Sequence, residues 1–381
     1  MGLHNLSDEQ RAFVESIRDF AARETGSREQ RDRLTDHNRN PHNQEVYERV
    51  AELGWIGVSI PEAYGGSGGG AFDMCLMLEE TTRGLIPIQF VGVSMITAGA
   101  IERFGSEELK REVLGGIARG RPECIAMSEP EAGSDVGALS CRAEPVDGHY
   151  VINGQKTWIT GAHMADHILL VCRTKRSEDK HDGLTMLSVP RDTEGLEIRL
   201  IETMAGREVN DLFFTDCRVP ADRLVGVQDQ GWRQLMAGLN HERLIIAAQA
   251  LGMAQRAFDD TLAYVKERRQ FGRPVGSFQA LKHRLADLLT EIEAARLLVY
   301  DVASRADADP SKTLPREASM AKLKATEVAK HATLEGIQMM GGAGYAVEYG
   351  MEHQARVALV TTIYGGTSEI QREIIARTLG L

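Results

Sequence analysis

The chain has 381 residues, of which 43% are hydrophobic and 26% charged, as in a globular protein long enough for more than one core. Its net charge of −11, from 44 basic and 55 acidic residues, argues against a general nucleic-acid binder, because binding a phosphate backbone requires a basic face. The five cysteines are scattered without a Cys-X-X-Cys spacing, which predicts a reducing compartment. The N-terminal stretch lacks a long apolar run, so we predict a cytoplasmic protein without membrane insertion.

The first of three compositional zones, residues 1–120, is predicted to be helical. Ser7 followed by Gln10 has the spacing of a capping box, and apolar residues then recur at helical intervals as far as Phe20. A glycine-rich segment at 64–72 interrupts this zone before the helical pattern resumes.

The second zone, residues 121–228, is predicted to be a β domain. Asn153-Gly154 stands between two β-prone runs and predicts a hairpin turn. Further short strands are expected at 167–174, 183–190, 196–200 and 211–220. Because turn residues rather than helical segments separate these runs, the pattern predicts an antiparallel sandwich or barrel instead of alternating βαβ units.

The third zone, residues 229–381, is helical again and rich in alanine and leucine. An unusually long helix is expected from about Trp232 to Arg268, followed by a turn between helices at 306–315 and a glycine-rich break at 341–345. With no fixed-period repeat and no low-complexity linker in the chain, we predict one integrated subunit with an α+β fold in three parts.

Glu242 stands out in the long helix because it lies on an apolar stripe. Leu235, Leu239 and Ile246 fall on the same helical face as this carboxylate. A carboxylate is costly to bury unless it is paired or used in chemistry. A structural ion pair and a catalytic role are the two interpretations.

Several other segments have both a structural and a functional interpretation. The segment 124–139 is either an ordinary polar loop or a ligand-binding one. Trp158 and Thr160 either lie on the face of a sheet with a structural role or bind a flat heteroaromatic ligand. The arginines within 267–288 form either a solvated helix end or a diphosphate site. In 364–372, Thr367 is expected to cap a helix whose start could approach a phosphate or ribose.

The order and spacing of five such motifs resemble the acyl-CoA dehydrogenase family of flavoproteins over nearly the whole chain. The motifs are MSEPEAGSD, NGQKTWITGA, ERRQFGRPVGSFQ, QMMGGAGY and YGGTSEIQR. The resemblance implies an N-terminal helical domain (1–120), a middle antiparallel β domain (121–228) and a C-terminal four-helix bundle (229–381). It also implies a homotetramer that binds FAD between the β domain and the C-terminal helices, with a neighbouring subunit completing the site.

The resemblance assigns site residues at matching positions. Ile125, Met127 and Ser128 would line the flavin, Gly133 and Ser134 would approach its pyrophosphate and the ligand, and Trp158 and Thr160 would flank the isoalloxazine. Contributions toward the diphosphate and adenosine half would come from Arg268, Gln270, Phe271, Gln279, Gln338, Gly342, Thr367 and Glu369. Arg243 would anchor coenzyme A, with Asn240 and Ser134 nearby.

Gly365 occupies the position where this family often places its catalytic base. A glycine retains the backbone N–H that would bind the thioester carbonyl but supplies no carboxylate. The sequence His241-Glu242-Arg243-Leu244 resembles the isovaleryl-CoA and long-chain acyl-CoA dehydrogenases, which carry the base on this helix. We therefore expect Glu242 to be the base, with its pKa raised by an apolar pocket. Arg243 should point about 100° away around the helix and need not neutralise it.

The resemblance implies oxidation of an acyl-CoA thioester to the trans-2-enoyl-CoA, a reaction of fatty-acid β-oxidation, with electrons passed to an electron-transfer flavoprotein. Moving the base away from Gly365 favours branched or bulky acyl groups. The alternatives are an oxidase of the same superfamily that reduces oxygen, and a non-catalytic flavin-binding relative that binds nucleic acid. His283 and His331 are isolated on helical faces, and no cluster has metal-ligand spacing, so we assign no metal.

Overall fold

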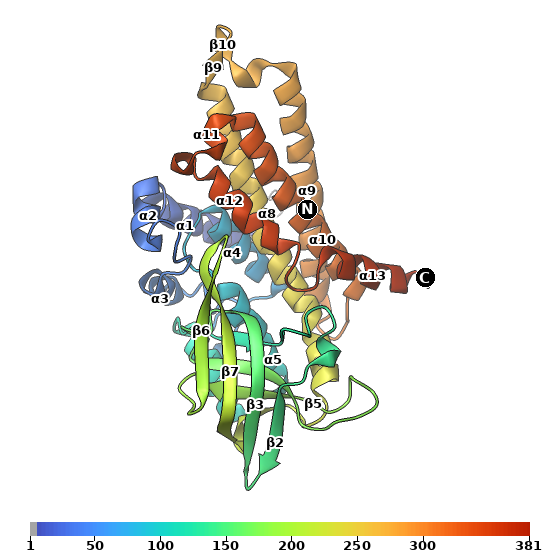
Figure 1. Ribbon diagram of the computed structural model, residues 1–381. Helices are drawn as coiled ribbons and strands as arrows, with labels where there is room; N and C mark the ends of the chain where they lie inside the picture. The colour runs from blue at the N-terminus through green and yellow to red at the C-terminus, as the bar shows by residue number, and fades with distance from the viewer. Residues whose placement is uncertain (1–5) are drawn as a thin grey trace. The chain divides into compact units, whose positions relative to one another are not determined.

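The structure, a computed structural model, describes residues 6–381 and divides into two compact units (Figure 1). The first unit comprises the chain up to Arg33, Gly70–Ile86 and Glu242–Leu381, and the second comprises Leu34–Gly69 and Pro87–His241. Each unit therefore combines segments that lie far apart in the sequence.

Helices make up nearly all of the first unit. The unit contains α1 (Asp8–Glu24), most of α2 (Arg28–Thr35), α4 (Ala71–Arg83), α8 (Gly231–Glu267) from Glu242 onward, α9 (Gln279–Ala308), α10 (Pro315–Met340), α11 (Gly342–Tyr345), α12 (Met351–Thr361) and α13 (Ser368–Thr378). The predicted capping box is confirmed at the start of α1, where Ser7 and Gln10 exchange hydrogen bonds. The predicted long helix is confirmed as α8, and the expected turn separates α9 from α10.

The C-terminal helices form a closely packed bundle. Helix α10 packs against α9, α12 and α13. A Cβ atom added to Gly336 of α10 would lie 2.8 Å from Thr261 Oγ1 of α8 and 2.7 Å from Met351 Sδ of α12. Glycine at this position therefore allows three helices to approach more closely than any larger residue would permit.

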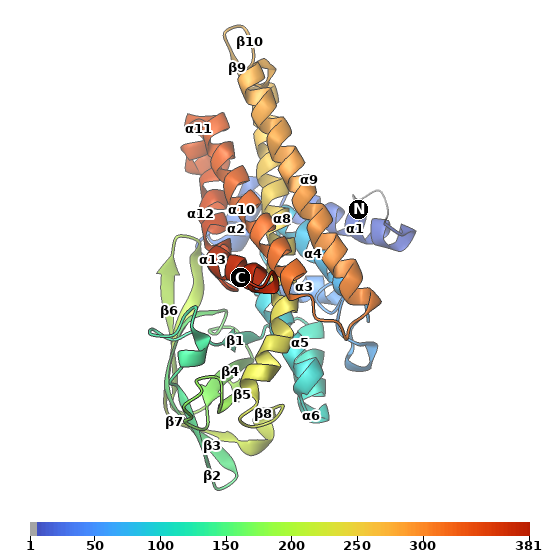
Figure 2. The same cartoon turned by 90° about the vertical axis from the view of Figure 1, so that its right-hand side faces the viewer.

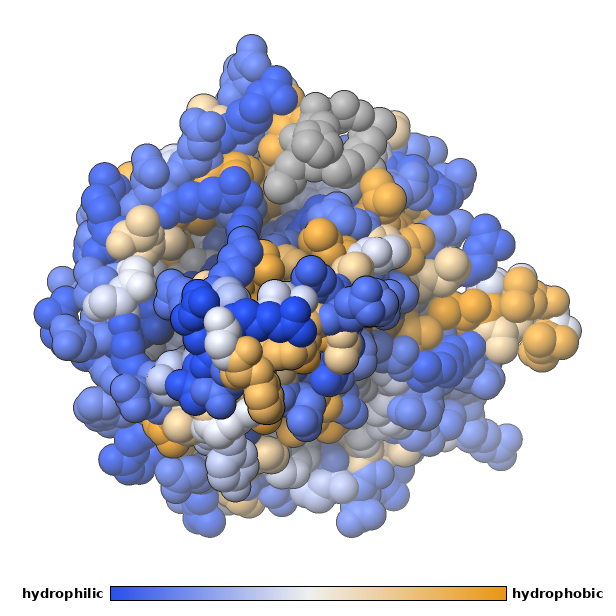
Figure 3. Space-filling view, turned by 90° about the horizontal axis from the view of Figure 1, so that it is seen from above, coloured by the Kyte–Doolittle hydropathy of each residue, from blue (hydrophilic) through white to orange (hydrophobic). Residues whose placement is uncertain are grey.

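A short hairpin joins the end of α8 to the start of α9 (Figure 2). Its strands are β9 (Arg269–Gln270) and β10 (Arg273–Pro274). Phe271 in the two-residue turn has φ 51° and is 93% exposed. Seen from above, the surface is mainly hydrophilic, with hydrophobic residues near the middle of the view and at its right-hand edge (Figure 3). Phe271 is thus a bulky aromatic residue in a left-handed conformation and almost fully exposed, which suggests a role in binding.

The second unit holds the sheet, several further helices and the start of α8, up to His241. Its helices are α3 (Gln44–Glu52), α5 (Val91–Phe104), α6 (Glu107–Leu109) and α7 (Gly115–Ala118). Its strands are β1 (Cys124–Ala126), β2 (Arg142–Val146), β3 (His149–Thr160), β4 (His167–Arg173), β5 (Leu184–Pro190), β6 (Leu196–Thr203), β7 (Gly206–Pro220) and β8 (Leu224–Val225). The four strands predicted after residue 166 are confirmed as β4, β5, β6 and β7, in that order, whereas the short strand β8 was not predicted.

All eight strands belong to one sheet, in the order β6-β7-β3-β2-β4-β5-β8 with β1 beside β4. Most neighbours are antiparallel, but β4 pairs in parallel with β1 and β2. One hydrophobic core contains buried residues from β3 and β7 together with residues from β4 and β5. Strands from both ends of this order thus contribute to the same hydrophobic core. The order ends at the edge strands β6 and β8, so the sheet is open and does not close into a barrel.

The predicted hairpin at Asn153-Gly154 is wrong, because β3 continues through both residues. Asn153 instead exchanges hydrogen bonds with Asp216 across a bulge in the neighbouring strand β7. A Cβ on Gly154 would lie 2.7 Å from the Cα of Cys141, so this glycine serves close strand packing. The hairpin turn lies earlier, at Asp147-Gly148, where both residues have positive φ as a type I′ turn requires.

The fold class is confirmed as α+β, with helical N-terminal and C-terminal parts and a β domain between them. The exact boundaries 1–120, 121–228 and 229–381 stay a prediction. All five cysteines are free and buried. Within residues 6–381 every helix is too short or too polar to cross a bilayer.

Candidate functional site

Glu242 lies on α8 in the first unit and is 7% exposed. Leu244 and Ile246, its neighbours on the helix, are also buried. Burial raises the pKa of the Glu242 carboxyl, while the charges of Arg243 and Lys322 oppose this rise. Among the described residues, no hydrogen bond or ion pair is found for Glu242, and Arg243 and Lys322 act on it only through their charges, so the structure does not support the interpretation as a structural ion pair.

Gly365 lies next to this carboxylate, in the turn between α12 and α13. Its φ is 61°, in the left-handed region. A Cβ atom at Gly365 would lie 3.4 Å from Glu242 Oε1 and would overlap Cδ1 of Ile246. The structure therefore brings together the two residues that the sequence linked, and Ile246 fills the space that a side chain at position 365 would need.

Two buried residues hold this turn: Lys322, for which no role was predicted, and Gln371, which was expected to reach polar ligand atoms instead. The Nζ of Lys322 donates to the carbonyl of Gly366 at 2.9 Å, and Nε2 of Gln371 donates to the carbonyls of Gly365 and Gly366, each at 3.0 Å. Both side chains are fully buried. The signal that could have revealed Lys322 is its place on the alanine face of α10, beside Ala318 and Ala325, where a cation is as unexpected as Glu242 is on α8.

Arg243 and Asn240 flank Glu242 in the sequence. Arg243 is 8% exposed, and burial lowers the pKa of its guanidinium while the charge of Glu242 raises it. The two side chains thus influence each other despite their different directions on the helix. Asn240 is half-buried and belongs to the second unit. Their assignment to coenzyme A stays a prediction.

The residues predicted to line the flavin form a second group, in the second unit. Met127 and Ser128 follow strand β1 directly. The Met127 carbonyl accepts from Lys156 Nζ at 2.8 Å, and the Ser128 carbonyl accepts from the Thr157 N–H at 3.0 Å. These bonds fasten the loop to β3 immediately before Trp158.

Lys156 also forms a buried ion pair with Glu129, at 2.8 Å. The Glu129 carboxylate accepts from the backbone N–H groups of Ser140 and Cys141 as well. Although burial opposes it, the charge of Lys156 with these hydrogen bonds lowers the pKa of Glu129. A fully satisfied buried pair of this kind makes the loop rigid.

Trp158 lies in a bulge of β3 with φ 63°, between Lys156 and Ile159, where the pairing with β7 shifts register. The bulge turns its side chain outward, and it is 62% exposed. A tryptophan with a left-handed backbone conformation carries strain of about 1–2 kcal/mol. An exposed, rigidly placed ring beside the half-buried Thr160 fits a flat heteroaromatic ligand better than a sheet-face packing role does.

The remaining predicted cofactor residues are placed as follows. Ile125 is half-buried in β1, and Gly133 and Ser134 are exposed in the loop that follows. In the first unit, Thr367 caps α13 as predicted, accepting from the Ile370 N–H at 3.3 Å. Exposed positions in that unit are occupied by Arg268, Gln270, Phe271, Gln279, Gln338, Gly342 and Glu369. Exposure of these side chains is compatible with the expectation that a neighbouring subunit receives them.

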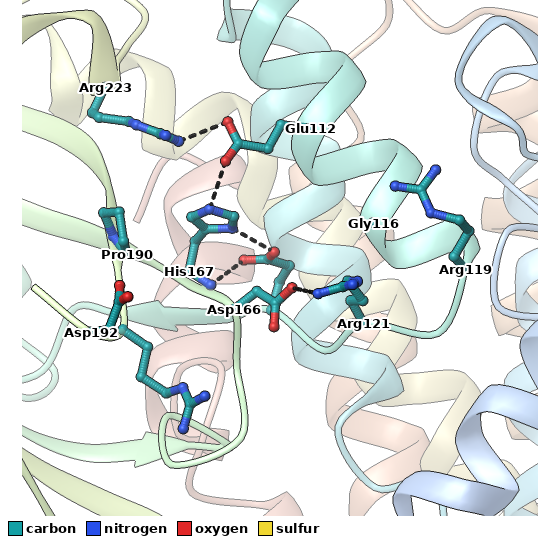
Figure 4. Close-up of a pocket in the computed structure, with 11 residues that line it drawn as sticks. Glu112, Gly116, Arg119, Arg121, Asp166, His167, Pro190, Asp192 and Arg223 are labelled. Atoms are coloured by element: carbon teal, nitrogen blue, oxygen red, sulfur yellow. Dashed lines mark hydrogen bonds and ion pairs between the residues drawn. The ribbon is translucent and has the colours of Figure 1, made fainter.

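A separate surface pocket of about 520 Å³ lies in the second unit, at the ends of β4 and β5 (Figure 4). In it, the His167 ring joins Glu123 at 2.9 Å to Glu112 at 3.0 Å, and Arg223 pairs with Glu112 at 2.8 Å. Burial raises the pKa of Glu123 to about 7, and the carboxylates raise the pKa of His167 against its own desolvation.

The positive and negative charges of the other side chains in this pocket also largely cancel. Arg121 pairs with Asp166 at 2.9 Å, Arg191 donates to the His163 carbonyl, and Arg119 and Asp192 have opposite charges. The lining contains none of the predicted site residues. We interpret this pocket as an ion-pair network that joins the helical segment before β1 to the strand ends.

The fold, with helical N-terminal and C-terminal parts and a β domain between them, belongs to a class of oxidoreductases, as comparisons with known proteins show. Three family models cover nearly the whole chain: "Acyl-CoA dehydrogenase, N-terminal domain" over residues 7–121, "middle domain" over 124–217 and "C-terminal domain" over 229–380. The chain belongs to the acyl-CoA dehydrogenase family, as its motifs predicted.

Individual relatives agree. The chain is 38% identical over 380 residues to "Probable acyl-CoA dehydrogenase YngJ" of Bacillus subtilis, covering 98% of both chains. It is 34% identical to "Caffeyl-CoA reductase-Etf complex subunit CarC" of Acetobacterium woodii, covering 98% of this chain and 99% of the other. The crystal structure of an acyl-CoA dehydrogenase from Geobacillus kaustophilus superposes with a TM-score of 0.92 at 34% identity, over 99% of this chain and 100% of the other.

The protein is thus an oxidoreductase that acts on acyl-CoA, and its cofactor is FAD. An FAD complex has been solved for PigA, which matches with a TM-score of 0.91 at 28% identity over 99% of both chains. The residues present fit this cofactor, because the second unit offers Trp158 as an exposed aromatic platform and Ser128 on a fastened loop. Across residues 6–381, acidic, histidine and cysteine side chains do not gather into a candidate metal site.

Proposed function

We propose that the enzyme removes the α proton of an acyl-CoA thioester with Glu242 and forms the trans-2-enoyl-CoA. The observation that supports this most directly is a buried carboxylate, without ion pair or hydrogen bond among the described residues, 3.4 Å from where a side chain at Gly365 would begin. A carboxylate used only for structure would be expected to have a partner.

The raised pKa of Glu242 suits it to general-base catalysis. A carboxylate of ordinary pKa is a weak base at neutral pH, and burial brings its proton affinity closer to the working pH. When substrate excludes the remaining water, the pKa rises further. Glu242 then holds the α proton at one of its carboxylate oxygens.

The Gly365 N–H is proposed to stabilise the thioester carbonyl as negative charge develops on its oxygen. Lys322 and Gln371 bind the two carbonyls of this turn, which limits its movement during the reaction. A preorganised donor needs no rearrangement at the moment of proton removal.

When bound, FAD would supply the acceptor for the β hydride. Ser128, Trp158 and Thr160 are proposed to hold and orient the isoalloxazine, with Ile125, Met127, Gly133 and Ser134 nearby. The diphosphate and adenosine half is assigned to the exposed group that contains Arg268 and Thr367. Assembly as a homotetramer would supply that group from a neighbouring subunit.

Several finer points belong to the same proposal. Arg243 would anchor coenzyme A, with Asn240 and Ser134 beside it. Because Gly365 has no side chain, we favour branched or bulky acyl groups. The proposed acceptor is an electron-transfer flavoprotein, which is supported by the 34% identical CarC, a subunit of a complex with such a protein. We also propose a cytoplasmic location.

The test is an anaerobic titration of the holoenzyme with straight, branched and cyclic acyl-CoAs, following the bleaching of the flavin absorbance. Wild type should bleach, and Glu242→Gln should bind coenzyme A ligands without bleaching. Reduction of the variant at the wild-type rate would show that Glu242 is not the base. A clear preference for butyryl-CoA over isovaleryl-CoA would refute the preference for branched groups.

The electron acceptor is tested separately, by comparing oxygen consumption with the reduction of electron-transfer flavoprotein. Faster turnover with oxygen would identify an oxidase of the same superfamily. DNA binding without flavin bleaching by any acyl-CoA would support the non-catalytic relative, which the net charge of −11 disfavours.

A further inference from the structure

Lys322 is a fully buried cation for which the family resemblance suggested no role. It lies on α10 among buried alanines, and its Nζ donates to the Gly366 carbonyl at 2.9 Å. A lysine ammonium is rarely taken out of water completely without a function or a carboxylate partner. In this case the hydrogen bond goes to a neutral backbone carbonyl next to the residue that faces Glu242.

The charged groups around Lys322 come from three helices. Glu242 and Arg243 act on it from α8, Glu369 from α13 and Glu327 from α10 itself. Burial lowers the pKa of Lys322 to about 8, while the negative charge of Glu242 raises it. The positive charge of Lys322 in turn lowers the pKa of Glu242. The two buried groups are therefore coupled electrostatically.

The same lysine also fixes the backbone of the turn. Gly365 and Gly366 have φ values of 61° and 81°, and their carbonyls follow directly on the N–H proposed to bind the thioester oxygen. The Gly366 carbonyl accepts hydrogen bonds from both Lys322 and Gln371. Glycines in this conformation are flexible without such anchors.

We propose that Lys322 is a positioning residue for the dehydrogenation: its ammonium group anchors the Gly366 carbonyl, and its positive charge favours the carboxylate form of Glu242, which accepts the substrate α proton. This inference rests on the proposed function, because Lys322 acts only through Glu242 and the Gly365 turn.

The first experiment isolates proton removal from hydride transfer. Holoenzyme is reduced with dithionite, incubated with isovaleryl-CoA in D₂O at a series of pD values, and deuterium uptake at the α carbon is measured by mass spectrometry. Because the reduced flavin takes no hydride, uptake reports the base alone. Wild-type exchange should fall on the acid side as Glu242 becomes protonated.

Three variants of Lys322 separate charge from structure. Lys322→Gln retains an N–H donor but loses the charge. The pH below which exchange falls, the acid limb of the profile, should therefore rise by about one unit or more. Lys322→Arg retains the charge and should return the limb toward that of wild type. Lys322→Met matches the lysine stem and serves as a second neutral variant should the glutamine variant fail to fold.

Lys324 supplies the matched control. It lies two residues further along α10 and pairs with Glu291, and its side chain is 35% exposed. Residues two apart on a helix point to different faces, so Lys324→Gln should leave the exchange profile unchanged. A shift equal to that of Lys322→Gln would mean that any charge loss on α10 has this effect, and would overturn the proposal.

A second readout requires no catalysis. The infrared band of the protonated Glu242 carboxyl is identified by its loss in Glu242→Gln. The intensity of this band is then measured as a function of pH in each holoenzyme, which gives the pH midpoint of Glu242 protonation. Neutral Lys322 variants should show a higher midpoint than wild type. Midpoints and exchange profiles that coincide with those of wild type would refute the role of Lys322.

The two proposals fail in different ways. If Glu242→Gln still exchanges the α proton at the wild-type rate, the base assignment is wrong whatever Lys322 does. If Glu242→Gln abolishes exchange but the neutral Lys322 variants match wild type, the base assignment stands and the inference about Lys322 is wrong.

Discussion

Replacing Gly365 by alanine tests the geometry that links this turn to Glu242. The new methyl group would overlap Cδ1 of Ile246 and lie 3.4 Å from Glu242 Oε1, on a backbone with φ 61°. Two separate costs therefore add: the strain of a left-handed conformation, and the insertion of an extra carbon into a filled space.

The magnitude follows from these two terms. A non-glycine residue in the left-handed region costs about 1–2 kcal/mol, and overpacking costs about 1–3 kcal/mol, so Gly365→Ala should lose about 2–5 kcal/mol of folding free energy. Gly350→Ala is the matched control, since Gly350 has φ 75° but nothing within 4 Å of an added Cβ. It should lose the strain term alone, about 1–2 kcal/mol.

A double-mutant cycle with Ile246→Val identifies the clash. Valine lacks the Cδ1 atom that the methyl group would overlap, so the double variant should be more stable than the sum of the single changes by about 1 kcal/mol or more. The assay is thermal unfolding of the holoenzyme at fixed protein and FAD concentrations. Additive effects, or equal losses for Gly365→Ala and Gly350→Ala, would refute this account of the turn.

Three further predictions concern the second unit. Burial raises the pKa of Glu208 to about 7, so this group contributes stability that is complete below its usual value of 4.5 and is lost as the pH rises through 7. Glu208→Gln should therefore be more stable than wild type at pH 8, by about 3 kcal/mol, but not at pH 4, as measured by denaturant unfolding at both values. Lys156→Met should lose about 3–5 kcal/mol because it leaves Glu129 buried and uncompensated, and Lys156→Met/Glu129→Gln should recover part of the loss in thermal melts. Trp158→Ala should melt as the wild-type apoprotein does, within about 0.5 kcal/mol, yet release flavin more readily in equilibrium dialysis; unchanged flavin affinity would contradict its role.

The parts of the fold that could be predicted are those that local chemistry determines. The capping box at Ser7 and the length of α8 follow from side chains whose effects reach one or two helical turns, and both are confirmed. Strands β4 to β7 could be predicted because turn residues flank each short β-prone run, whereas the two-residue strand β8 was too short to give such a pattern.

The failures come from contacts between distant parts of the sequence. Asn153-Gly154 has the composition of a hairpin turn, but Asn153 bonds to Asp216 and Gly154 allows Cys141 to approach. Asp147-Gly148, which has equally good turn chemistry, forms the hairpin instead. The sequence alone offers no reason to choose between the two pairs. Asn153 is held by Asp216, which lies more than sixty residues further along the chain on β7. Asp147-Gly148 instead joins β2 to β3, two strands that pair directly with each other.

At the candidate site, the sequence identified Glu242 and Gly365 but not the residues that support them. Lys322 and Gln371 act through backbone carbonyls, and no sequence pattern specifies which carbonyl a distant side chain will reach. A charged residue on an apolar helical face is nevertheless a usable signal, and Lys322 shares that signal with Glu242.

The position of Lys322 would explain how the proposed base Glu242 stays both ionised and reactive. A direct ion pair with a lysine would favour the carboxylate so strongly that proton uptake would become unfavourable. An isolated carboxylate in the same pocket would instead become protonated and could accept nothing. With its hydrogen bond directed to the Gly366 carbonyl, Lys322 supplies a positive field at Glu242 without contacting it, which leaves the pKa raised by burial yet lower than burial alone would set it. A general base needs this intermediate condition, since it must take the proton from the substrate and later release it.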